Sequence, residues 1–121
     1  MAKVLITDDA LFMRATLKAI LGSNGFTEIV EASNGQEAVD QYRAHRPDVV
    51  LMDITMPVMD GIAATERIRE IDPKARIVMC SALGQQDKVL LAVQAGARDF
   101  IVKPFEPAKV VDTVRRLAEA A

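Results

Sequence analysis

Five short apolar runs alternate with five longer amphipathic stretches along this chain of 121 residues, and this alternation restricts the fold more than any other feature. The runs are Lys3–Thr7, Thr27–Ala32, Asp48–Met52, Arg76–Cys80 and Arg98–Val102. The first, third and fourth contain apolar stretches without a polar interruption. Such strands are typical of parallel sheets that are covered by helices on both faces. The pattern therefore predicts a strand–helix unit repeated five times.

Helix-start and helix-stop signals lie between the runs. Asn34, with Glu37 three residues later, indicates a capping box, and Asp60 is a good N-cap. Gly96 is expected to end the fourth helix, and the last helix follows Pro107. The first helix is expected over about residues 11–23.

The polarity of the runs predicts their order in the sheet. The second run carries two acids and the fifth begins with Arg98 and Asp99, so these two are expected at the edges. The doubly wound, flavodoxin-like order 2-1-3-4-5 satisfies this requirement with right-handed crossovers. We therefore expect an α/β fold with a five-stranded parallel sheet, forming one domain over residues 1–121.

Composition excludes several classes of function. Lys and Arg total 15 against 17 Asp and Glu, a net charge of −2, which gives no basic surface for nucleic acid. Cys80 is the only cysteine, so no internal disulfide can form and a reducing compartment is expected. No apolar stretch approaches the roughly 18 residues of a membrane helix. We expect a cytoplasmic protein without a membrane partner.

Three carboxylates are expected at one point of the sheet edge. Asp8 and Asp9 follow the first run, Asp53 follows the third, and these strands flank the predicted switch point. The mutual repulsion of close carboxylates raises the pKa of at least one of them unless a cation is present, and an all-oxygen site suits Mg²⁺. The alternative is that these acids are only helix caps and loop residues.

The fourth and fifth runs bring Ser81 and Lys103 to the same edge. A hydroxyl and an ammonium that face three acids and a metal form a site for a phosphoryl group. Taken singly, Ser81 would be a turn residue and Lys103 a solvated surface residue.

Four separated motifs, in order, resemble the receiver domain of bacterial response regulators. They are Asp8-Asp9, Met52–Gly61, Ser81-Ala82 and Lys103-Pro104-Phe105. Within that family, the stretches Cys80–Gln86, Gln94–Ala97 and Asp99–Phe105 are similar to stand-alone chemotaxis regulators. The sequence ends one helix after Lys103, so no output domain is expected.

The resemblance implies a role for each matching acid. Asp53 would accept a phosphoryl group from a histidine kinase. Asp9 and Asp53 would bind Mg²⁺ through their side chains and Thr55 through its backbone carbonyl. Asp8 would hold a metal-bound water or share the ligation.

The resemblance also implies a switch. Ser81 and Lys103 would contact phosphoryl oxygens, and the bond from Lys103 to Pro104 is expected to be cis. Phe100 matches an aromatic switch position whose rotamer follows Ser81.

The function implied is that of a phosphorylation-activated response regulator in two-component signalling, monomeric and not an enzyme beyond its own phosphorylation and dephosphorylation. A chemotaxis histidine kinase and the flagellar motor switch protein would be its partners, with a phosphatase as a further candidate. Val89, Val93 and Phe100 would form the partner surface. On periodicity alone, we give equal weight to the alternative that both valines point into the core.

Two other functions fit the same fold. An aspartate-dependent phosphohydrolase needs a second Asp two residues after the nucleophile, where this chain has Thr55. A flavodoxin-like carrier needs a Ser-, Thr- and Gly-rich loop where Asp8 and Asp9 stand, and this chain has no Trp and one Tyr to flank a flavin. Within the receiver family, Thr7 is a departure because an aliphatic residue is more usual before the acid pair, and Thr55 and Leu83 lie where residues tune the lifetime of the acyl phosphate.

Overall fold

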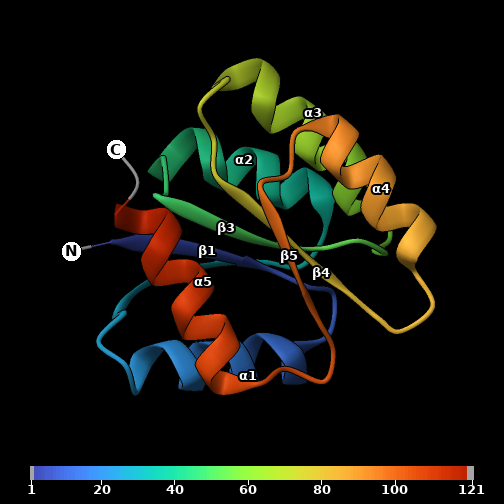
Figure 1. Ribbon diagram of the computed structural model, residues 1–121. Coiled ribbons are helices and arrows are strands. Elements are labelled where there is room, and N and C mark those ends of the chain that lie inside the picture. The colour runs from blue at the N-terminus through green and yellow to red at the C-terminus, as the bar shows by residue number, and fades with distance from the viewer. Residues whose placement is uncertain (1, 120–121) are drawn as a thin grey trace.

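The computed structural model describes residues 2–119, so both ends of the predicted domain, residue 1 and residues 120–121, lie outside the described part. Strands and helices alternate along the chain, as Figure 1 shows. The strands are β1 (Lys3–Thr7), β2 (Glu28–Ala32), β3 (Val49–Asp53), β4 (Ile77–Ser81) and β5 (Asp99–Val102). The helices are α1 (Leu11–Gly22), α2 (Gly35–His45), α3 (Gly61–Ile71), α4 (Gln86–Ala95) and α5 (Pro107–Glu119).

All strand pairs are parallel, in the order β2-β1-β3-β4-β5, which confirms the predicted topology and both edges. Helices α1 and α5 cover one face of the sheet, and α2, α3 and α4 cover the other (Figure 1). Side chains alternate between the two faces, because successive residues of a strand point to opposite sides. In β1, for example, Val4 and Ile6 pack with α1 and α5, whereas Leu5 packs toward α2 and α3.

The predicted helix signals are confirmed with one difference. The Asn34 side chain accepts a hydrogen bond from the Glu37 N–H, the Asp60 side chain accepts one from Ala63, and Gly96 ends α4 with φ +115°. The Glu37 carboxylate, however, accepts a hydrogen bond from the Ser33 N–H rather than from Asn34. None of the helices within residues 2–119 is long and apolar enough to cross a membrane.

Strands β3 and β4 each extend one residue further than predicted. Asp53 pairs in register with Cys80, and Ser81 with Val102, so ladder pairing continues to the first polar residue. Both chemically important side chains therefore start from rigid strand ends rather than from loops.

Thr7, the departure from the usual aliphatic residue, carries an unsatisfied hydroxyl. Its side chain is buried at the end of β1 and has no hydrogen-bond partner among the described residues. A buried hydroxyl without a partner costs about 1–3 kcal/mol, and valine has nearly the same shape. We expect Thr7→Val to raise the free energy of unfolding by about 1 kcal/mol.

Urea denaturation with an unchanged m-value measures this effect. Thr65→Val is the matched control, because Thr65 is equally buried but its hydroxyl donates to the Gly61 carbonyl at 2.7 Å. The control should not be stabilised. A Thr7→Val variant that is less stable than the parent chain would contradict the account of Thr7.

Candidate functional site

The carboxyl ends of β1 and β3 bring three acids together. Asp8, Asp9 and Asp53 each offer a carboxylate oxygen, and these oxygens all lie within 4.8 Å of one another. Asp8 and Asp53 are buried, whereas Asp9 is exposed. This cluster, called the acidic pocket below, therefore has two buried acids and one exposed acid at its mouth, at the sheet edge that the strand order predicted.

Lys103 joins the two buried acids. Its Nζ donates to Asp8 Oδ2 at 3.0 Å and to Asp53 Oδ1 at 3.2 Å. Burial alone would lower the pKa of the Lys103 ammonium, but the hydrogen bond to Asp8 and the charges of Asp53 and Asp8 outweigh burial and raise it. Lys103 is thus a fixed cation inside the pocket and not a solvated surface residue.

The ionised form of the Asp53 carboxyl group remains unfavourable despite this cation. Burial and the negative charge of Asp8 raise the pKa of Asp53, and the charge of Lys103 offsets only part of that effect. One ammonium cannot balance three carboxylates at this spacing. A further cation at the mouth would restore the balance.

The donor set of the pocket fits a hard divalent cation. All three side chains offer oxygen, and the exposed Asp9 leaves one side open for water ligands, which Mg²⁺ usually keeps. Thr55 lies two residues after Asp53, in the loop that follows β3, and its side chain is exposed.

Ser81 and Lys103 are held beside each other by the backbone. The Lys103 N–H donates to the Ser81 carbonyl at 2.8 Å, and the Ser81 side chain is buried. The peptide bond from Lys103 to Pro104 is cis, as predicted. The ends of β4 and β5 therefore deliver a hydroxyl and an ammonium to the edge where the acids lie.

The loop between β3 and α3 folds tightly against Asp53. The Gly61 N–H donates to the Ile54 carbonyl at 2.7 Å, and a Cβ at position 61 would collide with the Asp53 backbone carbonyl. Glycine is therefore required there, which explains why Asp60-Gly61 belongs to the motif. Val58 in the same loop has φ +69°, an unusual conformation for a β-branched residue.

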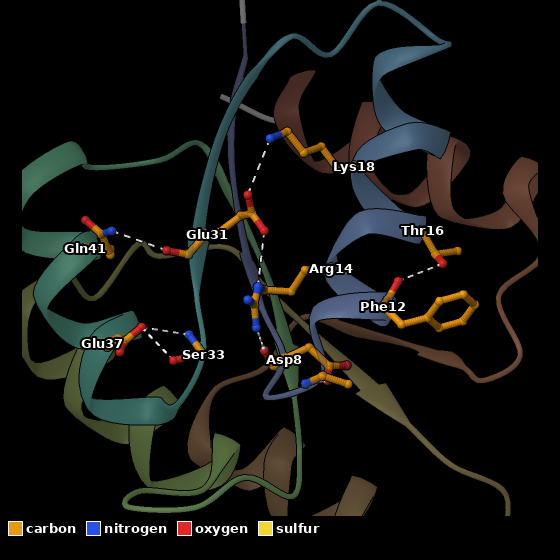
Figure 2. Close-up of polar contacts among 10 residues, drawn as sticks. Asp8, Phe12, Arg14, Thr16, Lys18, Glu31, Ser33, Glu37 and Gln41 are labelled. Carbon is orange, nitrogen blue, oxygen red and sulfur yellow. Dashed lines mark hydrogen bonds and ion pairs between the residues drawn. The ribbon is translucent and has the colours of Figure 1, made fainter.

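Figure 2 shows an anchor of the pocket that the sequence motifs did not predict. Arg14 of α1 donates to the Asp8 backbone carbonyl at 2.7 Å and pairs with Glu31 of β2 at 3.1 Å. Lys18 approaches the other Glu31 oxygen at 3.4 Å. A positive charge in the first turn of a helix interacts unfavourably with the helix dipole. Arg14 in the first turn of α1 therefore indicated, from the sequence, a side chain held there by a specific partner.

The predicted partner surface is partly exposed. Phe100 is 44% exposed and Val93 is 51% exposed, whereas Val89 is half-buried. Phe100 and Val89 line a cavity of about 250 Å³ together with Ser81 and Leu83. The alternative that both valines point into the core is wrong, because Val93 lies on the outer side of α4.

Comparison with known proteins identifies the family. Residues 4–115 match the model of the response regulator receiver domain. The chemotaxis protein CheY of Bacillus subtilis (strain 168) is 55% identical over 114 residues, which cover 94% of this chain and 95% of that protein. CheY of Thermotoga maritima is 52% identical over 117 residues, which cover 97% of this chain and 98% of that protein.

A solved structure agrees with both relatives. The complex of CheX and CheY with BeF3 and Mg²⁺ from Borrelia burgdorferi contains a chain that is 44% identical, with a TM-score of 0.90 over 96% of this chain and 88% of that one. These likenesses favour a signalling protein over the phosphohydrolase and flavin-carrier alternatives. The chain belongs to the response regulator receiver domain family and is of the CheY type.

Proposed function

We propose that this chain, with residues 1–121 as one receiver domain, takes a phosphoryl group from a chemotaxis histidine kinase on Asp53 and then binds the flagellar motor switch to control rotation. The observation that carries the proposal is the Lys103 ammonium, which contacts both Asp8 and Asp53 in the buried pocket. The CheY names of its relatives support chemotaxis as the pathway.

The chemistry follows from the position of Asp53. A carboxylate oxygen of Asp53 bonds to phosphorus while the bond from phosphorus to the kinase histidine breaks, and the histidine nitrogen leaves with the electron pair. The product is an acyl phosphate. Lys103 pairs with a phosphoryl oxygen and the Ser81 hydroxyl donates to another. The phosphodonor supplies the energy for the new bond. The only reactions that the chain would catalyse are its own phosphorylation and dephosphorylation.

Mg²⁺ is the proposed cofactor, with Asp9 and Asp53 as side-chain ligands, Thr55 as a backbone ligand and Asp8 sharing the ligation or holding a metal-bound water. When bound, it would neutralise charge on the transferring group. The fit of three carboxylates supports this assignment, as does the Mg²⁺ present in the Borrelia burgdorferi complex.

The proposed effect of phosphorylation on partner binding depends on the cavity that Ser81, Val89 and Phe100 line. Phosphorylation adds a charge of about −1.5 to −2 and draws Ser81 inward, which vacates space that the Phe100 ring can fill. The groove between α4 and β5 then deepens for an amphipathic helix of the motor switch protein. The chain would act in the cytoplasm as a monomer, and a CheX-like partner, as in the related complex, is the candidate phosphatase.

The binding step tests this function. We expect an N-terminal peptide of the flagellar motor switch protein to bind the phosphorylated chain about 5–150-fold more tightly than the unphosphorylated chain. Phe100→Ala should remove most of that difference, because the ring closes the vacated space. Calorimetric titration measures all three affinities. Equal affinities of the two wild-type forms would eliminate this surface as the phosphorylation-dependent output.

Lys103→Arg should separate phosphorylation from signalling. Arginine keeps the charge, but its planar fork cannot place one donor between Asp8 and Asp53 as an ammonium does. We expect the variant to accept the phosphoryl group and yet lose the gain of about 5–150-fold in peptide affinity. Lys74→Arg, an exposed lysine beyond α3, is the control. Wild-type peptide affinity in phosphorylated Lys103→Arg would refute the role of the ammonium.

A further inference from the structure

The Gln85 side chain joins two loops at the mouth of the acidic pocket. Its Oε1 accepts a hydrogen bond from the Ala82 N–H at 2.6 Å, and its Nε2 donates to the Thr55 hydroxyl at 3.1 Å. Ala82 directly follows Ser81 at the end of β4, and Thr55 lies two residues after Asp53. One carboxamide therefore ties the β4–α4 loop to the β3–α3 loop beside the proposed phosphoacceptor.

The Ala82 backbone fixes the orientation of this carboxamide. A backbone N–H only donates, so it must face the carboxamide oxygen. The amino end then faces Thr55, whose hydroxyl can accept. Both ends of the Gln85 side chain are thus satisfied in this orientation, whereas the flipped orientation would lose the hydrogen bond to the Ala82 N–H.

Local structure shows that the Gln85 side chain does not serve its own helix. Gln85 occupies the N-cap position of α4, yet its side chain makes no hydrogen bond to the first turn. Gly84 has φ +89°, which turns the chain back so that Gln85 reaches Ala82. A Cβ on Gly84 would meet no atom within 4 Å, so the backbone conformation alone favours glycine there.

We propose that the Gln85 carboxamide is a strap that occupies the Ala82 N–H in the unphosphorylated protein and so sets how readily Asp53 takes up a phosphoryl group. This inference rests on the proposed function. The Ala82 N–H directly follows the strand end that carries Ser81, and a backbone N–H is a good donor to a phosphoryl oxygen. Here the Ala82 N–H already donates to the Gln85 oxygen, so a phosphoryl group that uses this donor must displace that oxygen.

Removing the strap should strengthen binding of the phosphoryl group. For Gln85→Ala in the full chain, we expect the affinity for BeF3⁻ in the presence of Mg²⁺ to rise roughly two- to tenfold, the range that one net hydrogen bond gives. Fluorine NMR measures it. The rate of phosphorylation by acetyl phosphate should rise in the same direction. In that reaction an Asp53 oxygen bonds to phosphorus while acetate leaves with the electron pair, and intact mass follows the product.

Three comparisons separate a strap from a general disturbance of the loop. Gln86→Ala removes the neighbouring exposed glutamine and should behave as wild type. Thr55→Val cuts only the far end of the strap and should give a smaller increase than Gln85→Ala. Hydrogen exchange of the Ala82 amide should be faster in Gln85→Ala than in wild type, and BeF3⁻ should restore its protection.

The outcomes distinguish this inference from the proposed function. Wild type that binds BeF3⁻ and gains a phosphoryl group, together with a Gln85→Ala variant of equal or weaker BeF3⁻ affinity, would overturn the strap alone. Wild type that shows neither BeF3⁻ binding nor the mass gain would overturn the proposed function and the strap with it. Higher affinity in Gln85→Ala, with unchanged Gln86→Ala, supports both.

Discussion

Asp53→Asn is expected to abolish phosphorylation by acetyl phosphate or by a phosphorylated kinase. The carboxamide lacks the anionic oxygen that must attack phosphorus. Among the three acids of the pocket, Asp53 alone is the last residue of a central strand and also accepts a hydrogen bond from Lys103. Asp8 also contacts Lys103, but its Oδ1 is already held by the Ala10 N–H at 2.9 Å. Intact mass after incubation with donor and Mg²⁺ measures the loss.

Asp60→Asn is the matched control for that experiment. Asp60 lies in the loop that follows Asp53 and acts as the N-cap of α3, a role that asparagine performs equally well. The control should gain the phosphoryl mass at the wild-type rate. Modification of Asp53→Asn at the wild-type rate would show that another residue is the acceptor.

Asp53→Asn should also stabilise the metal-free fold. Burial and the charge of Asp8 raise the pKa of Asp53, so at neutral pH the buried carboxylate destabilises the fold, and asparagine removes this destabilisation. Between the usual aspartate pKa and the raised value, the folded state holds more protons than the unfolded state, so stability falls as pH rises. The advantage of Asp53→Asn should therefore shrink as pH falls through that window. Urea denaturation in chelator measures it.

Removal of divalent cations is expected to reduce phosphorylation of the wild-type chain to background. With only Lys103 present, a phosphoryl group would add further negative charge to a pocket of three carboxylates, and one ammonium cannot offset it. Asp9→Ala should reproduce much of this defect at limiting Mg²⁺ because it removes the exposed oxygen donor. Because few protein ligands surround the ion, binding should be weak, and excess Mg²⁺ should restore part of the rate.

Calorimetric Mg²⁺ titration, together with intact mass after acetyl phosphate, checks this expectation. Asp112→Ala, an exposed acid on α5, is the matched control and should leave both measurements unchanged. Undiminished phosphorylation in excess chelator would refute the requirement for a metal.

The sequence alone determined the architecture and the identity of the acids. Unbroken apolar runs in β1, β3 and β4 indicated central strands, and the acids in β2 indicated an edge. These signals are local, since burial on both faces excludes polar residues wherever such a strand lies. Parallel pairing then brings all carboxyl ends to one edge, so Asp8, Asp9 and Asp53 could be placed together before any contact was known.

Tertiary structure decided which atoms meet. Lys103 contacts Asp8 and Asp53 across 95 and 50 residues of sequence, and Gln85 reaches Thr55 across 30. Hydrophobic periodicity limits which face a residue lies on, but strand register, loop conformation and side-chain rotamers set distances within that face. The split between half-buried Val89 and exposed Val93 has the same cause, because both share one helical stripe and only the packing of α4 against the sheet distinguishes them.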